Sequence, residues 1–530
     1  MRIDRLLTLA SLAAAMTACE SGDINLAPTN IDNSTGGGGG NGGSSNPCGA
    51  YTTPSGQVRR GSFDGENCRY DSTFSSASNP VTGDLDIPLI DGVHIFEDVL
   101  MIGRDVSSGT APAEGEGPVL TIAAGATLAF NDESDYLVIN RGSRIIAEGR
   151  PDAPITFTSV TDAVLGTVGP EDVQQWGGIV INGNGITNNC TDEQRASNDC
   201  HVLSEGRPVH YGGNDNEESS GILRYVVVKH TGSEVAPDDE LNGITFNAVG
   251  SGTVVSHLQV YSTYDDGIEF FGGAVNVDHF VALYVKDDSI DFSDGYVGTI
   301  DTALIIQPEL DGNRCIEGDN IGDTRAASGV PLDTEPMTKP TIRNMTCIIG
   351  NGDMNTHDPA EGPTLRRGPQ MTLVDSIIYG AYADDIDSNN ECFEIDEDGV
   401  TDLFAQQGLT SVRNTLIVCE LAVQTNHLPN GDTLEEWFLG ANPSTNGADY
   451  SFNVGNVIIQ RPDVSANANL AILDLFYTRP DLVDADGNPL TMTPESDRLG
   501  AVTRENDWTI GWTYGLHEEN RGQPLWFEAP

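Results

Sequence analysis

Positive charge is scarce in this 530-residue chain. It has 26 Lys and Arg against 80 Asp and Glu, only three of the bases are lysines, and the formal net charge is −54. Such a chain repels polyphosphates and anionic bilayer surfaces, so we expect no nucleic-acid partner. Taken alone, the charge favours a solvated acidic surface suited to salty water over a specific cation site.

Helical periodicity and catalytic motifs are also scarce. Short apolar runs, punctuated by 60 glycines, take the place of amphipathic helical segments. The sequence contains no GxSxG, HExxH or P-loop pattern and no CxxC pair, so the common hydrolase, nucleotide-binding and zinc or redox motifs are missing. We therefore expect an all-β chain, and we assign no catalytic residue.

A 22-residue repeat lies at the centre of the chain. Ile268-Glu269-Phe270 recurs as Ile290-Asp291-Phe292 (290 − 268 = 22), and Asp265-Asp266 recurs as Asp287-Asp288 (287 − 265 = 22). The first motif alternates apolar and charged residues, as a half-buried strand does. A fixed period without intervening helices predicts a parallel β-helix, a solenoid in which each coil stacks on its neighbour.

Several segments resemble a widespread group of bacterial surface lipoproteins. They are LTIAAGATLAF (120–130), INRGSRIIAEGRPDAPITFTS (139–159), WGGIVINGNG (176–185), GILRYVVVKHTG (221–232), DDGIEFFGG (265–273) and DWTIGWT (507–513). The resemblance implies a right-handed parallel β-helix similar to the pectin-lyase-like superfamily. It implies no function, because one fold hosts many functions.

The first residues resemble a bacterial lipoprotein signal. Arg2 and Arg5 precede an apolar run that is too short to span a bilayer and ends at Ala18-Cys19. The lipobox-like ending implies lipidation of Cys19, and Glu20 stands where inner-membrane lipoproteins commonly carry Asp. We expect an outer-membrane lipoprotein that faces the cell exterior; ordinary secretion with an incidental Cys19 is the alternative.

These features divide the chain into five parts: a signal peptide (1–18), the lipidated Cys with a Gly/Ser/Asn-rich tether (19–47), an N-terminal cap (48–118), the parallel β-helix (119–430) and a C-terminal cap region (431–530). In the last part, a short helix is expected over 432–439, with Asp432 or Thr433 as its N-cap. Trp508 and Trp512 are expected to plug the last coil rather than to bind sugar.

Eight cysteines follow Cys19, and an even count in an exported chain favours disulfides. Sequence alone leaves the connectivity open. We expect neighbours to pair, which gives Cys48–Cys68, Cys190–Cys200, Cys315–Cys347 and Cys392–Cys419.

Carboxylates at corresponding positions of successive coils predict a calcium site. Like charges one coil apart repel, so a column of them favours a bound cation, and oxygen ligands suit Ca²⁺. Capping of turns through the backbone is the alternative role for each Asp. The candidate ligands are Asp238, Asp239, Asp265, Asp266, Glu269, Asp287, Asp288, Asp291 and Glu317.

A second acidic segment, 394–402, imitates the first half of an EF-hand loop and adds Asp396 and Asp398 as candidate ligands. Gly399 stands at the sixth position, as such a loop requires. The twelfth position falls on Ala405, where a bidentate Glu belongs, so a plain acidic turn explains the segment equally well.

The sequence favours a binding protein over an enzyme. The leading hypothesis is a calcium-stabilised surface lipoprotein that captures a ligand for a TonB-dependent transporter, a step that rests on analogy with other tethered lipoproteins. The alternatives are an adhesive or structural scaffold and a polysaccharide lyase or hydrolase. Lyases of this fold pair calcium-binding carboxylates with an Arg or Lys base, and Lys286, His257 and His279 lie near the repeat. Stacked histidines are more often wall residues, and the net charge repels a polyuronate.

Overall fold

The computed structural model describes residues 46–236, 239–350, 359–380, 391–419 and 421–439, and the shorter segments 444–446, 450–452, 457–460, 495–496 and 498–528. Strands dominate these residues. The described helices are short: η1 (Thr161–Leu165), α1 (Asp192–Ala196), α2 (Asp323–Ala327), α3 (Thr401–Gln406) and α4 (Leu434–Leu439). None of them has the length and apolar character that crossing a membrane requires.

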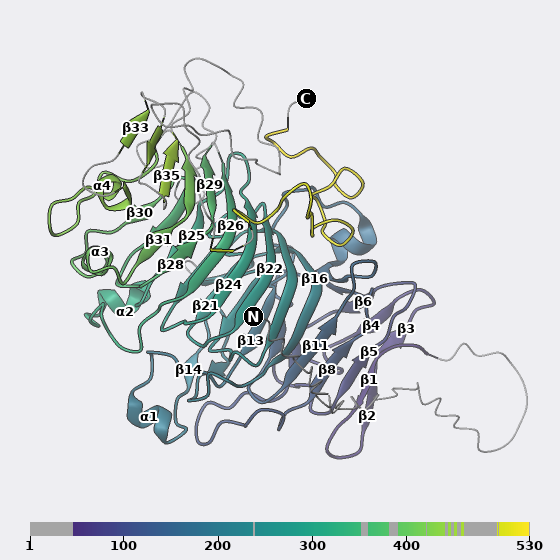
Figure 1. Ribbon diagram of the computed structural model, residues 1–530. Helices are drawn as coiled ribbons and strands as arrows, with labels where there is room; N and C mark the ends of the chain where they lie inside the picture. Colours follow the sequence, from purple (N-terminus) through teal and green to yellow (C-terminus); the bar gives the residue numbers. More distant parts are fainter. Residues whose placement is uncertain are drawn as a thin grey trace, which may run out of the picture. The chain divides into compact units, whose positions relative to one another are not determined.

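Nine short parallel strands of the described residues form one face of the solenoid (Figure 1). In spatial order they are β7 (Leu100–Ile102), β10 (Leu137–Ile139), β13 (Ile179–Asn182), β19 (Ile244–Asn247), β21 (Ile268–Phe271), β23 (Ile290–Ser293), β25 (Arg314–Gly318), β27 (Glu361–Leu365) and β30 (Glu394–Ile395). Ile268 pairs with Ile290, and Glu269 pairs with Asp291. The register therefore confirms that the 22-residue repeat stacks one coil on the next.

Two further ladders of parallel strands are joined in a 22-stranded sheet. They are separate in the early coils, as β4 (Cys68–Tyr70), β6 (His94–Phe96), β9 (Thr127–Phe130) and β12 (Ile155–Ser159) beside β5 (Leu85–Ile87), β8 (Val119–Ile122) and β11 (Arg144–Glu148). They merge in β16 (Gly221–Thr231), β20 (Val254–Thr263), β22 (Asn276–Leu283), β24 (Thr299–Ile306) and β26 (Thr341–Ile349). They separate again as β28 (Thr372–Val374) and β31 (Ser411–Arg413) beside β29 (Ile377–Gly380), β32 (Thr415–Val418) and β35 (Val457–Gln460).

One residue with positive φ bends each merged strand at its middle. His257 and His279 have φ values of 56° and 61°, and the ladder pairs resume on either side of them. Side chains other than Asn, Asp and His rarely adopt this left-handed conformation. The column of bends comprises Tyr225, His257, His279, Thr302, Asn344, Asp375 and Asn414. Each coil thus turns from one ladder into the next without a loop.

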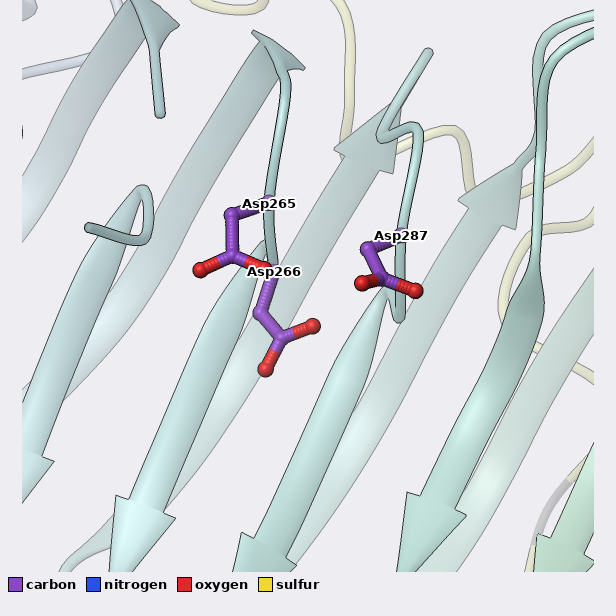
Figure 2. A group of neighbouring side chains, drawn as sticks. All are labelled: Asp265, Asp266 and Asp287. Carbon is purple, nitrogen blue, oxygen red and sulfur yellow. The ribbon is translucent and has the colours of Figure 1, made fainter. Parts of the chain in front are cut away.

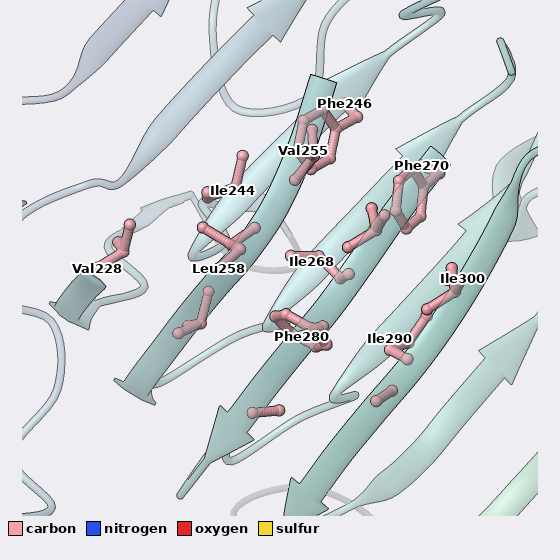
Figure 3. Close-up of a cluster of buried hydrophobic side chains, with 14 of the residues drawn as sticks. Val228, Ile244, Phe246, Val255, Leu258, Ile268, Phe270, Phe280, Ile290 and Ile300 are labelled. Carbon is pink, nitrogen blue, oxygen red and sulfur yellow. The ribbon is translucent and has the colours of Figure 1, made fainter. Parts of the chain in front are cut away.

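Stacked apolar side chains fill the interior (Figure 3). Ile244, Ile268 and Ile290 occupy successive coils and are fully buried. The rings of Phe246 and Phe270 stack with their centroids 5.3 Å apart. Because every coil adds the same apolar side chains to the column, burial of this surface stabilises the fold in proportion to the number of coils.

The solenoid begins before residue 119, so the expected cap over 48–118 was too long. Among the strands before residue 119, antiparallel pairing involves β1 (Ala50–Thr52), β2 (Val58–Arg60), β3 (Ser62–Phe63) and their partners. Cys68 already pairs in parallel with His94. At the other end, β35 extends a ladder within the expected C-terminal cap region. Three-residue strands show too little alternation to reveal these coils in the sequence.

The C-terminal segment 498–528, which we call the strap, lies along the flank of the solenoid (yellow in Figure 1). The rings of Trp508 and Trp512 lie 6.0 and 5.8 Å from that of His257, on a middle coil. Tyr514 exchanges two hydrogen bonds of 2.7 Å with the Gln259 amide. The expectation that the two tryptophans plug the last coil is therefore wrong. They cover outward-facing apolar residues of the large sheet, whose exposure to water is unfavourable.

All four predicted disulfides are present: Cys48–Cys68, Cys190–Cys200, Cys315–Cys347 and Cys392–Cys419. Cys315 lies on β25 and Cys347 on β26, so this bond joins two faces of the solenoid through its interior. The Cys190–Cys200 bond closes the loop that contains α1.

Candidate functional site

Seven carboxylates gather on the outer side of the nine-stranded sheet. Glu269, Asp291 and Glu317 lie at paired positions of β21, β23 and β25, where strand alternation turns them away from the buried apolar residues. Two acidic pairs lie in the turns that lead into β21 and β23. We call Asp265, Asp266, Glu269, Asp287, Asp288, Asp291 and Glu317 the acidic face.

The carboxylates form three overlapping groups. Within each group the nearest carboxylate oxygens all lie within 4.8 Å of one another. The groups are Asp265/Asp266/Asp287, Asp266/Glu269/Asp291 and Asp288/Asp291/Glu317. Figure 2 shows the first group, to which two adjacent coils contribute. Since neighbouring groups share Asp266 or Asp291, the oxygens form one continuous strip.

Hydrogen bonds along the turns fix part of this strip. Asp266 Oδ1 accepts the backbone N–H of Asp288, and Asp288 Oδ1 accepts that of Arg314, both at 3.1 Å. Asn242 Oδ1 accepts the N–H of Asp266 in the same way. Backbone capping, the alternative role for these residues, thus uses one oxygen each of Asp266 and Asp288. Asp266 and Asp288 therefore belong to the acidic groups and also cap the backbone.

The expected ligand Asp239 does not align with the acidic face. Ile244 pairs with Ile268, which places Asn242 rather than an acidic residue opposite Asp266. Asp239 lies in β18 (Asp239–Glu240), which pairs antiparallel with β17 (Glu234–Ala236). Asp238 lies outside the described residues. The 24-residue offset between β19 and β21 (268 − 244 = 24) is correct, but the hairpin before β19 holds Asp239 three residues before Asn242, the counterpart of Asp266.

Burial and mutual repulsion together raise the pKa values of carboxyl groups in the acidic face. Burial, followed by neighbouring carboxylates, raises the pKa of Asp265 and Asp266 well above the ordinary value. The same causes raise the pKa of Glu269 and Asp291. Burial and the charge of Asp287 raise the pKa of Asp288 to about 8. A cation held among these groups offsets both effects, because it favours their charged form.

Arginines accompany the acidic residues at the far end of the strip. Arg314 Nη1 lies 3.0 Å from Glu317 Oε2, and Arg366 contacts Glu317 and Asp319. Burial, followed by the neighbouring Arg367, lowers the pKa of Arg366 to about 10. Sequence reasoning missed these partners, although Arg366-Arg367 is a conspicuous pair in a chain so poor in bases.

The EF-hand-like segment does not join the acidic face. Asp398 accepts hydrogen bonds from the backbone N–H groups of Arg367, Val400 and Thr401, at 2.7–2.8 Å, and so fixes the start of α3. Asp396 follows β30. Neither residue belongs to a metal-compatible group among the described residues. Metal binding by this segment stays a prediction.

The residues considered for catalysis have structural partners. The imidazole rings of His257 and His279 stack 4.5 Å apart under the strap. Burial, followed by the charge of His279, lowers the pKa of His257 to about 4. Lys286 Nζ lies 2.9 Å from Asp311 Oδ2. The wall role proposed for the two histidines agrees with this packing.

A cavity of about 650 Å³ lies beside the acidic face. Its wall comes from the loop 202–208 and Tyr211, and Phe271 of β21 also lines it. Phe271 follows Glu269 by two residues and faces the same side of the sheet. Nothing in the sequence showed that this loop lies beside β21.

A family model, the pectate-lyase-like β-helix domain, matches residues 110–451. The match covers more than half of the chain, and the chain belongs to this family. No curated protein and no solved structure matches it. Membership confirms the predicted parallel β-helix and the resemblance to the pectin-lyase-like superfamily, and it indicates a surface or polysaccharide-related protein. The role of each residue must be argued from the site itself.

Proposed function

We propose that this protein is a non-catalytic binding protein stabilised by calcium, with the acidic face as its cation site. The observation that carries the proposal is the continuous strip of carboxylate oxygens contributed by successive coils. Pectate-lyase-like β-helices present elongated outer surfaces, and function in solenoids is commonly placed on such surfaces.

The residues present fit Ca²⁺. This ion takes six to eight oxygen ligands at about 2.3–2.6 Å and tolerates irregular geometry. Asp291 Oδ1 and the Ser293 hydroxyl are buried and have no hydrogen-bond partner among the described residues. Both lie on the outer side of β23, two positions apart. Buried polar atoms without partners are unfavourable, and a bound, hydrated cation would satisfy them.

The test compares two variants that change the net charge equally. The first carries Asp265→Asn, Asp287→Asn and Asp291→Asn, and the control carries Asp152→Asn, Asp192→Asn and Asp199→Asn, all on exposed side chains. We expect calcium to raise the melting temperature of the wild type and the control but not that of the first variant. Isothermal titration with CaCl₂ measures the binding directly. Equal calcium responses in all three proteins would remove the acidic face from the proposal.

We also propose that the protein is anchored in the outer membrane through lipid on Cys19, faces the exterior and serves a TonB-dependent transporter. The lipobox-like sequence and the tether composition support the anchor, and analogy alone supports the transporter. Replacement of Cys19 by Ser should move the protein out of the membrane fraction and abolish labelling by a radioactive fatty acid. Co-purification of a β-barrel transporter from detergent-solubilised membranes tests the partner.

A calcium-assisted polysaccharide lyase is the second candidate. The observation that favours it is the partly buried Arg366 beside Glu317 and Asp319, because its lowered pKa increases the fraction of neutral guanidine, the form that can accept a proton. Elimination creates a carbon–carbon double bond in the product, so ultraviolet absorbance reports turnover. Activity on a polysaccharide that is lost in Arg366→Gln would favour this candidate over pure binding.

A further inference from the structure

The cavity beside the acidic face constitutes a second binding site, distinct from the strip of carboxylate oxygens. We propose that it binds a small organic cation, a compound that carries an ammonium group, against the wall that the adjacent rings of Tyr211 and Phe271 form. This site goes beyond the calcium-binding function, and its occupant need not touch the calcium ion.

Aromatic and aliphatic side chains provide the contact surface. The rings of Tyr211 and Phe271 lie 6.4 Å apart at an interplanar angle of 35°, and both line the cavity. Val202, Leu203 and Pro208 add apolar surface. An alkylated ammonium group suits such a wall, because its methylene groups pack against the rings while its charge is attracted by their faces.

Acidic side chains outnumber basic ones on the cavity wall by two to one. Glu205 and Asp294 line it, and the charge of Glu205 contributes to the raised pKa values of Asp265, Glu269 and Asp291. Asp294 is paired with Arg325 at 2.7 Å.

The guanidinium of Arg207, which also lines the cavity, lies 4.1 Å from the centre of the Tyr136 ring. This contact leaves the charge of Arg207 in place, so one arginine stands against Glu205, Asp294 and the neighbouring acidic face in setting the electrostatic field of the cavity. That field favours a cation and opposes a carboxylate.

The size and rigidity of the cavity suit a small molecule. Its volume lies within the range of about 300–1,000 Å³ typical of small-molecule sites. The Cys190–Cys200 disulfide closes the preceding loop, and Ser204 Oγ accepts a hydrogen bond of 2.8 Å from the Asn247 amide. The Arg141 guanidinium donates to the carbonyl of Gly212 at 2.7 Å. A wall fixed in this way loses little conformational freedom when a ligand binds.

The test uses choline and its uncharged isostere 3,3-dimethylbutan-1-ol as probes in isothermal titration with the full-length protein. We expect choline to bind at least about tenfold more tightly, since the two differ only in charge and a tenfold ratio corresponds to about 1.4 kcal/mol. Equal affinities would show an apolar cavity without cation selectivity. Failure of choline to bind would also overturn the proposal.

Variants separate this site from the calcium site. Phe271→Leu should weaken choline binding several-fold while the calcium response persists, and Glu205→Gln should weaken choline binding with the aromatic wall intact. Leu310→Ala, on a side chain that is 50% exposed, is the control. The triple variant at Asp265, Asp287 and Asp291 should lose calcium binding and retain choline binding with reduced affinity. If choline binding were lost there but unchanged in Phe271→Leu, choline would occupy the calcium site and the proposal would be wrong.

Discussion

Burial between stacked coils changes the pKa of a single carboxyl group, that of Glu218. Its side chain is 3% exposed, and its Oε1 accepts the backbone N–H of Gly250. Burial, which outweighs this hydrogen bond, raises its pKa to about 7. Glu218 therefore titrates within the physiological range in the folded protein, and near its ordinary value of 4.5 in the unfolded chain.

The raised pKa of Glu218 predicts a loss of stability as pH rises. Its contribution is present below about pH 4.5 and is lost as pH rises through about 7, because the folded state then releases a proton that it bound more tightly. The shift corresponds to about 3 kcal/mol. In Glu218→Gln the melting temperature should fall less between pH 5 and pH 8 than in the wild type, as measured by calorimetry. The exposed neighbour Glu217→Gln is the control and should behave as the wild type does.

Residue positions were predictable wherever strand alternation determined them. Glu269, Asp291 and Glu317 align as expected. Only one strand register buries the apolar residues on either side of them. Asp239 was misplaced because an inserted hairpin changes the spacing without changing the acidic pattern. Arg366 was missed since its contacts depend on how a neighbouring coil packs.

Among the elements, short-range signals were reliable. The helix expected over 432–439 is α4, and Thr433 forms its capping box with Glu436: Thr433 Oγ1 accepts the Glu436 N–H at 3.1 Å, and Glu436 Oε2 accepts the Thr433 N–H at 3.0 Å. The strap had no such signal. Its packing partners, among them Tyr261 and Leu304, are distant in sequence, and their outward orientation is visible only in the folded sheet.

Trp512 anchors the strap, so its removal should loosen this element. Its side chain is 2% exposed and packs against Tyr225 and His257. Truncation of such a side chain typically costs about 3–5 kcal/mol. In Trp512→Ala, limited trypsin digestion should cut within the strap, at Arg504 or Arg521, faster than in the wild type, as followed by mass spectrometry. Ile510→Ala, on a side chain that is 57% exposed, should leave the rate unchanged; equal acceleration in both variants would contradict the anchoring role.

For the molecule as a whole, the periodic part of the fold was predictable and its ends were not. Because successive coils have similar sequences, one clear repeat at 264–296 was enough to predict the solenoid. The first coils and the strap do not repeat that pattern. The cavity could not be predicted from the sequence for the same reason, because a non-repeating loop forms its wall.

The net charge of −54 predicts that salt stabilises the folded chain. Self-repulsion opposes the compact state, and ions reduce it: the screening length falls from about 30 Å at 0.01 M to about 3 Å at 1 M. The melting temperature should rise with NaCl over this range. At equal ionic strength CaCl₂ should raise it further, through the acidic face. A melting temperature that falls with NaCl would show that favourable ion pairs outweigh repulsion.

The paired register of Glu269, Asp291 and Glu317 has an evolutionary consequence. Each of these coils contributes one carboxylate from its strand, and two of them add an acidic pair from the preceding turn, so the strip grows coil by coil. Tandem duplication of a single coil-encoding segment would lengthen the strip by one ligand set and leave the existing ones in place. Under the proposed calcium binding, the number of ions would change in whole steps, by the same genetic event that lengthens the scaffold.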